Sequence, residues 1–261
     1  MCIIVCVKQV KNFNLNSETG VAYRKSNEML NNPSDLAAIS WAMKLKEQYG
    51  FTVITISMGP SVAIPLVRQL YSYGVDRALL LTSPILSGSD TYATSYAIGK
   101  VIKALFSGYS LIICGDKSLD GETGQVPHSV ATELNINSFA NVSDISYQNG
   151  NFEIVCEIDT TWVRITSENK LLVTVTQGPG GYVYSPTIKN ILCSKSKNVE
   201  IITCNNLSLS DESVGHKGSF TKVISLHHKK MDSKRNTFKI YFEEEQEKLD
   251  LLMNSLVGDK L

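Results

Sequence analysis

The chain has 261 residues, of which 43% are hydrophobic and 19% are charged, so it can build one large domain with its own core. The 25 Lys and Arg residues balance the 25 Asp and Glu residues, which argues against nucleic acid or an anionic membrane as the partner. No apolar run has transmembrane length and no leader peptide precedes the first apolar run, so we expect a cytoplasmic protein without membrane insertion.

Neither the cysteines nor the histidines predict a metal site. The six cysteines are widely scattered and no pair has the Cys-x-x-Cys spacing of zinc, iron–sulfur or redox sites. None of the four histidines has metal-ligand spacing to another ligand, and no Ser/His/Asp or Cys/His arrangement predicts nucleophilic catalysis. We therefore assign no metal and no catalytic residue.

The first half of the chain alternates strand-like and helix-like segments. Short, nearly continuous apolar runs predict strands that are buried on both faces; these runs cover residues 1–7, 51–58, 77–82 and 110–114. Helical patterns follow each run, with Ser34 or Asp35 expected to cap the first helix. Pro65 requires the second helix to begin late or to kink, and the Ser89–Asp90 pair is expected to cap the third. Repeated units of this kind predict a doubly wound, mostly parallel α/β sheet.

The second half of the chain has a different pattern. Residues 142–147, 152–158 and 161–166 predict a β-meander with an Asn149-Gly150 turn, and residues 170–176 predict another buried strand. From about Cys193 the chain becomes polar, and residues 242–256 have the apolar stripe of an amphipathic helix. We expect a nucleotide-binding α/β domain over 1–192, and an extended C-terminal arm over 193–261 whose final helix contacts a partner subunit.

The segment GDKSLDGETGQV, residues 115–126, joins a buried strand to a helix. Ligands of open α/β sheets bind at the carboxyl ends of the strands, where loops expose N–H groups and helices present their positive ends. Gly121 and Gly124 would let the backbone approach a phosphate, whereas Asp120 and Glu122 would repel one. From spacing alone, phosphate binding and a plain connection before a capped helix are equally good interpretations.

Four separate motifs resemble the β-subunit of the electron transfer flavoprotein family, in that family's order and at its spacings. They are VKQV at residues 7–10, Asn32 with Pro33, ISMGP at residues 56–60 and LDGETGQV at residues 119–126. The resemblance extends over roughly residues 1–195. It implies a fold like that of the adenine-nucleotide α-hydrolases and a heterodimer of a bacterial type.

The resemblance also implies a cofactor and the residues that hold it. The β-subunit of this family holds AMP in non-bifurcating members and FAD in electron-bifurcating members, while the α-subunit carries a further FAD. The form DGETGQV favours FAD here. Matching the family's nucleotide contacts position by position implies the following residues: Cys6, Asn32, Pro33, Ser34, Asp35, Met58, Gly115, Asp120, Gly121, Glu122, Thr123, Gly124, Gln125 and Val126.

A partner-recognition loop is implied as well. The family places an exposed leucine just past the last core strand, where it enters a pocket of a dehydrogenase, and the matching position here is Ile188. Lys189, Lys195 and Lys197 follow it. The implied redox partner is a protein like an acyl-CoA dehydrogenase or another redox protein, although without the family an ordinary core isoleucine would be the better interpretation.

Three departures from the family pattern affect the partner side of the molecule. Lys11 replaces the usual proline after VKQV, the stretch GGYVY at residues 180–184 lacks the usual arginine, and the basic run after the recognition loop is diluted. These changes put the redox partner in doubt more than the nucleotide, because the phosphate loop keeps the family pattern.

Two functions from other classes stay open. The chain could be a non-redox, adenine-nucleotide-binding sensor or assembly subunit that keeps the same fold. An enzyme of the ATP-pyrophosphatase type is the weaker alternative, because its Ser-Gly-Gly-like phosphate loop would follow the first strand and Val7–Lys11 lack it. The leading hypothesis is an electron carrier subunit.

Overall fold

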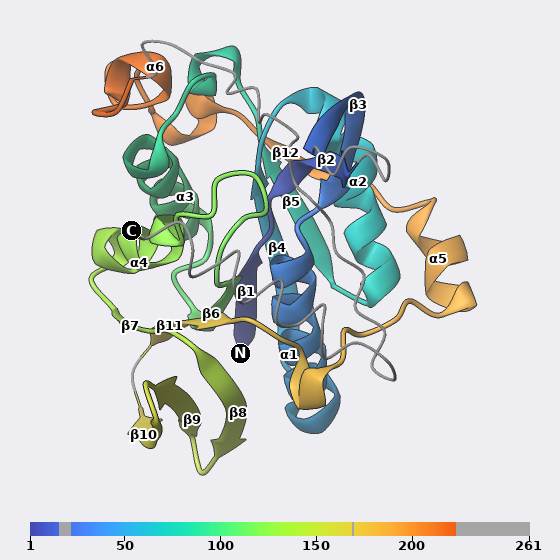
Figure 1. Cartoon of the computed structure of the whole chain (residues 1–261), viewed down its shortest axis with the longest axis vertical. Coiled ribbons are helices and arrows are strands. Elements are labelled where there is room, and N and C mark those ends of the chain that lie inside the picture. The colour runs from blue at the N-terminus through green and yellow to red at the C-terminus, as the bar shows by residue number, and fades with distance from the viewer. Residues whose placement is uncertain (16–21, 169, 223–261) are drawn as a thin grey trace, which may run out of the picture.

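The computed structural model describes residues 1–15, 22–168 and 170–222. Its centre is a sheet of seven parallel strands in the order β12-β5-β4-β1-β6-β11-β7 (Figure 1). The bounds are β1 (Cys2–Cys6), β4 (Thr52–Met58), β5 (Arg77–Leu81), β6 (Tyr109–Gly115), β7 (Asn137–Phe139), β11 (Leu171–Val175) and β12 (Glu200–Ile202). The doubly wound α/β fold is therefore confirmed, and each apolar run expected to be a strand is one.

Helices cover both faces of this sheet. One face carries α1 (Pro33–Tyr49), α2 (Ile64–Gln69) and the 3-10 turn η2 (Leu70–Tyr73), and the other carries α3 (Thr91–Leu105) and α4 (Gln125–Leu134) (Figure 1). A separate hydrophobic core lies on each face of the sheet, and alternate residues of a strand belong to opposite cores. Ile3 and Val5 pack against α1, whereas Ile4 faces α3 and α4. Because both faces are covered, the strands are apolar at successive positions and not at alternate ones.

The β-meander is also confirmed. It consists of β8 (Val142–Gln148), β9 (Asn151–Ile158) and β10 (Thr161–Ser167), paired antiparallel. Asn149 and Gly150 both have positive φ, at 51° and 88°, as a two-residue hairpin turn of this kind requires. Phe152 joins Phe51 and Tyr147 in an aromatic cluster that attaches the meander to the α1 side of the sheet.

Three short regions differ from the sequence-based expectation. A hairpin of β2 (Gln9–Leu15) and β3 (Ala22–Asn31) was not anticipated, because its sequence is polar and has no strict alternation. The expected cap of α1 was wrong: Asn32 is the N-cap residue and no side chain caps this helix in the described part of the chain. Pro65 lies at the second position of α2, where a missing N–H costs nothing, so the helix starts late as expected.

Part of the polar segment after residue 192 joins the central sheet. The division expected at 192/193 falls inside α5 (Ile188–Ser194), and β12 then pairs with β5 at the edge of the sheet. The remaining short elements are η1 (Ser61–Ala63), η3 (Pro84–Leu86), η4 (Pro179–Gly181), η5 (Cys204–Leu207) and α6 (Gly215–Gly218). The helix expected at 242–256 lies outside the described residues.

Candidate functional site

A cavity of about 820 Å³ opens at the carboxyl ends of β1, β4 and β6 and beside the segment that follows β5. The winding of the sheet changes direction between β1 and β6, which is where open α/β sheets bind ligands. Ten of the fourteen residues expected to hold a nucleotide line this cavity: Cys6, Asn32, Asp35, Met58, Gly115, Gly121, Thr123, Gly124, Gln125 and Val126. The other four, Pro33, Ser34, Asp120 and Glu122, lie next to lining residues without being among them.

Asn32 fixes the loop between β6 and α4. Its side-chain amide donates to the carbonyl oxygen of Lys117 at 3.0 Å, and its Oδ1 accepts the N–H of Leu119 at 3.1 Å. Asn32 is buried, so these hydrogen bonds have little competition from water. The Asn32 side chain therefore fixes the facing loop, although it makes no cap bond to α1.

Asp35 joins the ends of the two strands on either side of the switch point. One carboxylate oxygen accepts the N–H of Lys8 at 2.8 Å and the other accepts the N–H of Gly115 at 3.2 Å. Burial raises the pKa of this carboxyl to about 7, although the N–H groups of Lys8 and Gly115 and the side chain of Asn32 act against that rise. A Cβ on Gly115 would lie 2.5 Å from Asp35 Oδ1 and 2.6 Å from the carbonyl carbon of Ser34, so only glycine fits there.

The loop ahead of α4 presents N–H groups to the cavity. Glu122 and Gly124 have φ of 52° and 62°, and Gly124 is the N-cap residue of α4. No side chain among the described residues caps this helix, which leaves the N–H groups of its first turn available to an anion. Thr91 Oγ1 donates to Gln125 Oε1 at 3.1 Å, and this bond turns the Nε2 donor of Gln125 to other partners.

Lys8 also belongs to the cavity. It lines the space after β1, and its ammonium lies 2.7 Å from Asp120 Oδ1 and 3.4 Å from Ser118 Oγ. Partial burial raises the pKa of Asp120, but the bond to Lys8 and its charge outweigh that effect and the pKa ends below its usual value. The carboxylate thus neutralises part of the positive charge that Lys8 brings to the site.

Sulfur-containing residues from three neighbouring strands line the cavity. Cys6 and Cys114 are in register on β1 and β6, and Met58 ends β4. The hydrogen bond with Cys6 and burial raise the pKa of the Cys114 thiol well above its usual value, so this thiol stays protonated. The floor of the cavity is therefore largely apolar.

Sequence reasoning missed one side of the cavity. Most residues of the segment between β5 and α3 line it, including Pro84, Leu86, Ser87 and Gly88, and so does Thr91 at the start of α3. The Ser89–Asp90 pair signalled only a helix start, and that expectation was correct: Asp90 caps α3 by accepting the N–H of Ala93 at 2.9 Å. We call residues 84–91 the serine-rich wall.

Ile188 is not among the residues that line the cavity. It is the first residue of α5, 79% of its surface is exposed, and Leu192 on the same helix is exposed as well. Thr187 caps the helix by accepting the N–H of Asn190 at 3.2 Å. The interpretation of Ile188 as an ordinary core isoleucine is therefore excluded.

Two further observations concern the described residues as a whole. They contain no group of three or more His, Cys, Asp or Glu side chains that could hold a metal ion. None of the described helices combines the length and the apolar character needed to cross a membrane.

Comparison with known proteins decides the family. Residues 19–205 match the model of the electron transfer flavoprotein domain. The chain is 31% identical to an electron transfer flavoprotein β-subunit from Thermoanaerobacterium thermosaccharolyticum, over 86% of this chain and 87% of the relative. The chain belongs to the electron transfer flavoprotein family. Within this family the chain has the role of the β-type subunit.

Two other relatives agree with that assignment. A β-subunit of an electron transfer flavoprotein from Megasphaera elsdenii is 29% identical over the full length of both chains. The γ electron transfer subunit of an acryloyl-CoA reductase from Anaerotignum propionicum is 30% identical, over 86% of this chain and 87% of the relative. Membership of the family carries an association with a flavin or nucleotide, with a partner subunit and with a redox partner.

Proposed function

We propose that this chain holds FAD in the cavity at the ends of β1, β4 and β6, as one half of a heterodimeric electron transfer flavoprotein. An α-subunit with a second FAD is the other half, and the pair passes electrons between a dehydrogenase or NADH and acceptor redox proteins. The observation that carries this proposal is the cavity itself, which lies at the switch point of the sheet and meets the uncapped first turn of α4.

The size of the cavity favours FAD over AMP, which is the alternative. Small-molecule sites commonly enclose roughly 300–1,000 Å³, and about 820 Å³ lies towards the upper end of that range. FAD has more than twice as many non-hydrogen atoms as AMP and would use more of this space. The apolar floor of Cys6, Met58 and Cys114 suits an aromatic ring system.

The residues divide into those that bind and those that position. The N–H groups at the start of α4, Thr123 and the Gln125 amide would hold the phosphates, and Lys8 would add a positive charge. Asn32 and Asp35 would keep the loop and the strand ends in place for them. FAD, when bound, would supply the hydride and single-electron chemistry. The chain's own contribution is binding, orientation and exclusion of water.

Purification of the chain together with its α-subunit tests this proposal. We expect two flavins per heterodimer and no extractable AMP, measured by flavin absorbance and by chromatography of the released nucleotides. One flavin and one AMP per heterodimer would show that this site holds AMP and not FAD. A complex without any flavin would favour a nucleotide sensor or assembly subunit.

Docking of the redox partner is proposed at α5. Ile188, Ile191 and Leu192 expose apolar surface on this short helix, and Lys189 and Lys195 are exposed beside them. An exposed apolar anchor with basic neighbours suits insertion into a pocket that has an acidic rim. One relative is named as the electron transfer subunit of an acryloyl-CoA reductase, which supports a partner of the acyl-CoA dehydrogenase class.

Ile188→Asp tests the docking surface. We expect electron transfer to the dehydrogenase to fall at least tenfold, while the flavin content of the heterodimer stays unchanged. Ile158→Asp, at an exposed isoleucine of β9 on the β-meander, is the matched control and should keep the full rate. Equal rates for the two variants would remove α5 as the docking surface.

The compartment and the C-terminal arm complete the proposal. All six cysteines are free, as suits the reducing cytoplasm of a bacterium. Residues 193–261 would form the arm that contacts the α-subunit. Cleavage of the heterodimer after Lys222 should release the α-subunit if the arm supplies the contact.

A further inference from the structure

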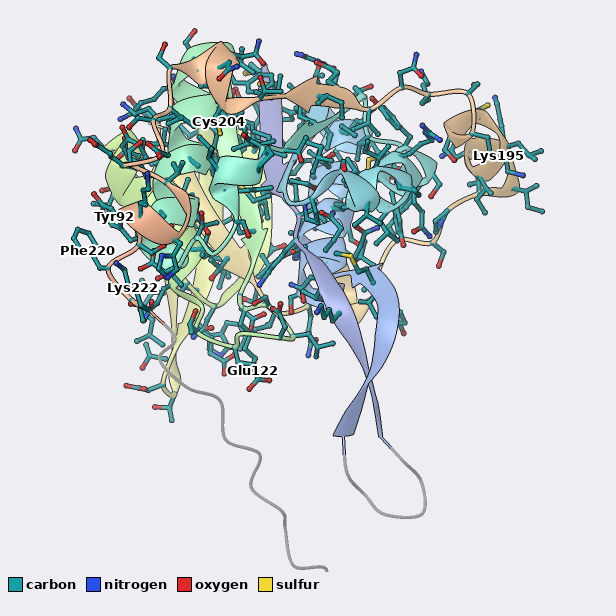
Figure 2. All side chains as sticks on the ribbon, turned by 90° about the horizontal axis from the view of Figure 1, so that it is seen from above. Tyr92, Glu122, Lys195, Cys204, Phe220 and Lys222 are labelled. Atoms are coloured by element: carbon teal, nitrogen blue, oxygen red, sulfur yellow. The ribbon has the colours of Figure 1, made fainter. Side chains whose placement is uncertain are left out.

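The serine-rich wall of the cavity is held from its outer side by residues 215–221, which we call the brace. The brace follows η5 and contains α6. Figure 2 shows Phe220 of the brace beside Tyr92, the residue that follows the wall, and their ring centroids lie 4.6 Å apart. The wall therefore has the cavity on one side and the brace on the other.

Several hydrogen bonds join the brace to the wall. Gly215 N–H donates to Ser89 Oγ at 2.9 Å and His216 N–H donates to the Ser87 carbonyl oxygen at 3.0 Å. Asp90 N–H donates to Ser219 Oγ, and the N–H of Thr221 donates to Asp90 Oδ2, both at 2.8 Å. The bonds run in both directions across the contact, so neither segment can shift alone without breaking several of them.

Ser219 is the central residue of this contact. Only 5% of its surface is exposed, and its hydroxyl also lies within hydrogen-bond distance of the Gly215 and Gly88 carbonyl oxygens, at 2.7 and 3.2 Å. The two backbones approach closely because both Gly88 and Gly215 have positive φ. A Cβ on Gly215 would lie 1.9 Å from the Ile85 carbonyl oxygen.

The wall in turn positions the phosphate loop. Asp90 caps α3 through Ala93 while it accepts the N–H of Thr221, and these N–H groups lower its pKa against the opposite effect of burial. The next residue, Thr91, donates to Gln125 Oε1, and Ser95 Oγ donates to the Val126 carbonyl oxygen at 3.3 Å. A continuous series of contacts thus leads from Ser219 to the first turn of α4.

We propose that the brace is a positioning element for the nucleotide, with Ser219 as its positioning residue. It sets the place of the serine-rich wall and, through Thr91, the direction of the Gln125 amide. This inference rests on the proposed nucleotide site. The coupling is reciprocal, so a bound nucleotide also stabilises the brace, which lies within the segment proposed as the arm.

Ser219→Ala in the full-length chain is the first test, with binding of AMP and of FAD measured by calorimetry. Whichever of the two nucleotides binds, we expect its dissociation constant to rise about five- to tenfold. The substitution removes the hydroxyl that accepts the Asp90 N–H and reaches the Gly88 carbonyl oxygen. Ser213→Ala is the matched control, since within the described part of the chain the Ser213 hydroxyl bonds only to Ser210, in its own turn. Its dissociation constant should equal that of the unchanged chain.

Glu200→Gln separates positioning from general stability. It weakens the bidentate pair with Arg77 at the sheet edge, where Arg77 Nε and Nη2 lie 2.7 and 2.6 Å from the carboxylate oxygens. This variant should unfold at a lower temperature and bind nucleotide as the unchanged chain does. If Ser219→Ala and Glu200→Gln lose affinity in proportion to their loss of stability, the brace has only a structural role.

Hydrogen exchange on the unchanged chain gives a readout that does not depend on any variant folding. Saturating nucleotide should slow exchange of the Gly215, His216 and Thr221 amides at least threefold. Protection of the loop at residues 115–125 without protection of these three amides would overturn the brace and keep the nucleotide site. A chain that binds neither AMP nor FAD would overturn both.

Discussion

The two sides of the cavity are fixed by different chemistry. The loop at residues 115–125 is held by the buried side chains of Asn32 and Asp35, which reach across from the start of α1. The serine-rich wall is held by backbone groups and by the hydroxyls of Ser89 and Ser219. One side depends on two polar side chains, and the other on several bonds spread over two backbones.

This difference predicts how each side responds to substitution. Removing one of several neutral hydrogen bonds typically costs about 1 kcal/mol, so the serine-rich wall should tolerate single changes. A buried carboxyl and a glycine in contact with it are more sensitive, because no neighbour can take over their roles. The following predictions run from the largest expected effect to the smallest.

Asp35→Asn should change how stability depends on pH. The folded-state pKa of Asp35 is raised to about 7, above its ordinary value of 3.8, so its contribution is full below pH 4 and is lost as pH rises to 7. Relative to the Asn variant, the wild type should lose about 3 kcal/mol between pH 5 and pH 8. Urea denaturation of both proteins across this range measures the difference, which parallel curves would contradict.

Among substitutions whose effect does not depend on pH, Gly115→Ala should be the most damaging on the side of the cavity formed by the loop at residues 115–125. Its Cβ would collide with Ser34 backbone and Asp35, and overpacking of this kind costs about 1–3 kcal/mol. We expect loss of measurable nucleotide binding, because the strand end and the start of α1 must separate. Gly108→Ala is the control, since its Cβ would meet nothing within 4 Å. A comparable loss of nucleotide binding in both variants would contradict the steric explanation.

Asn32→Ala should weaken nucleotide binding about tenfold, because two buried hydrogen bonds to the loop are lost at about 0.5–1.5 kcal/mol each. Helix α1 should keep its stability, since the Asn32 side chain makes no cap bond. Asn206→Ala, which removes a local bond to Thr203 in η5, should bind nucleotide normally. Calorimetry distinguishes these outcomes, and unchanged binding by Asn32→Ala would show that the loop holds its shape without this residue.

The sequence could predict the buried strands of the central sheet but not its short strands or the polar hairpin. Strands buried on both faces must be apolar throughout, so β1, β4, β5, β6 and β11 were evident as continuous runs. The strands β7 and β12 have three residues each, which is too short for any periodicity. The hairpin of β2 and β3 has a polar sequence that gave no strand signal.

The site was predictable on one side only. Asn32, Asp35 and the 115–125 loop carry distinctive residue types at fixed spacing, and they line or support the cavity. The contact between the serine-rich wall and the brace joins residues 126 to 131 positions apart. Serine and glycine are common in ordinary loops, so nothing in the sequence could pair these segments.

Lys8 should show the smallest effect, because it is half exposed and already paired with Asp120. Lys8→Gln should change the free energy of unfolding by less than about 1 kcal/mol and weaken nucleotide binding about threefold at low salt. Asp120→Asn should act in the opposite direction, since it releases the Lys8 ammonium for the phosphates. Both effects should shrink in 0.5 M salt, where the Debye length falls to roughly 4 Å. If Lys8→Gln still binds nucleotide more weakly at high salt, Lys8 contacts the nucleotide directly. A purely long-range electrostatic attraction would be screened under that condition.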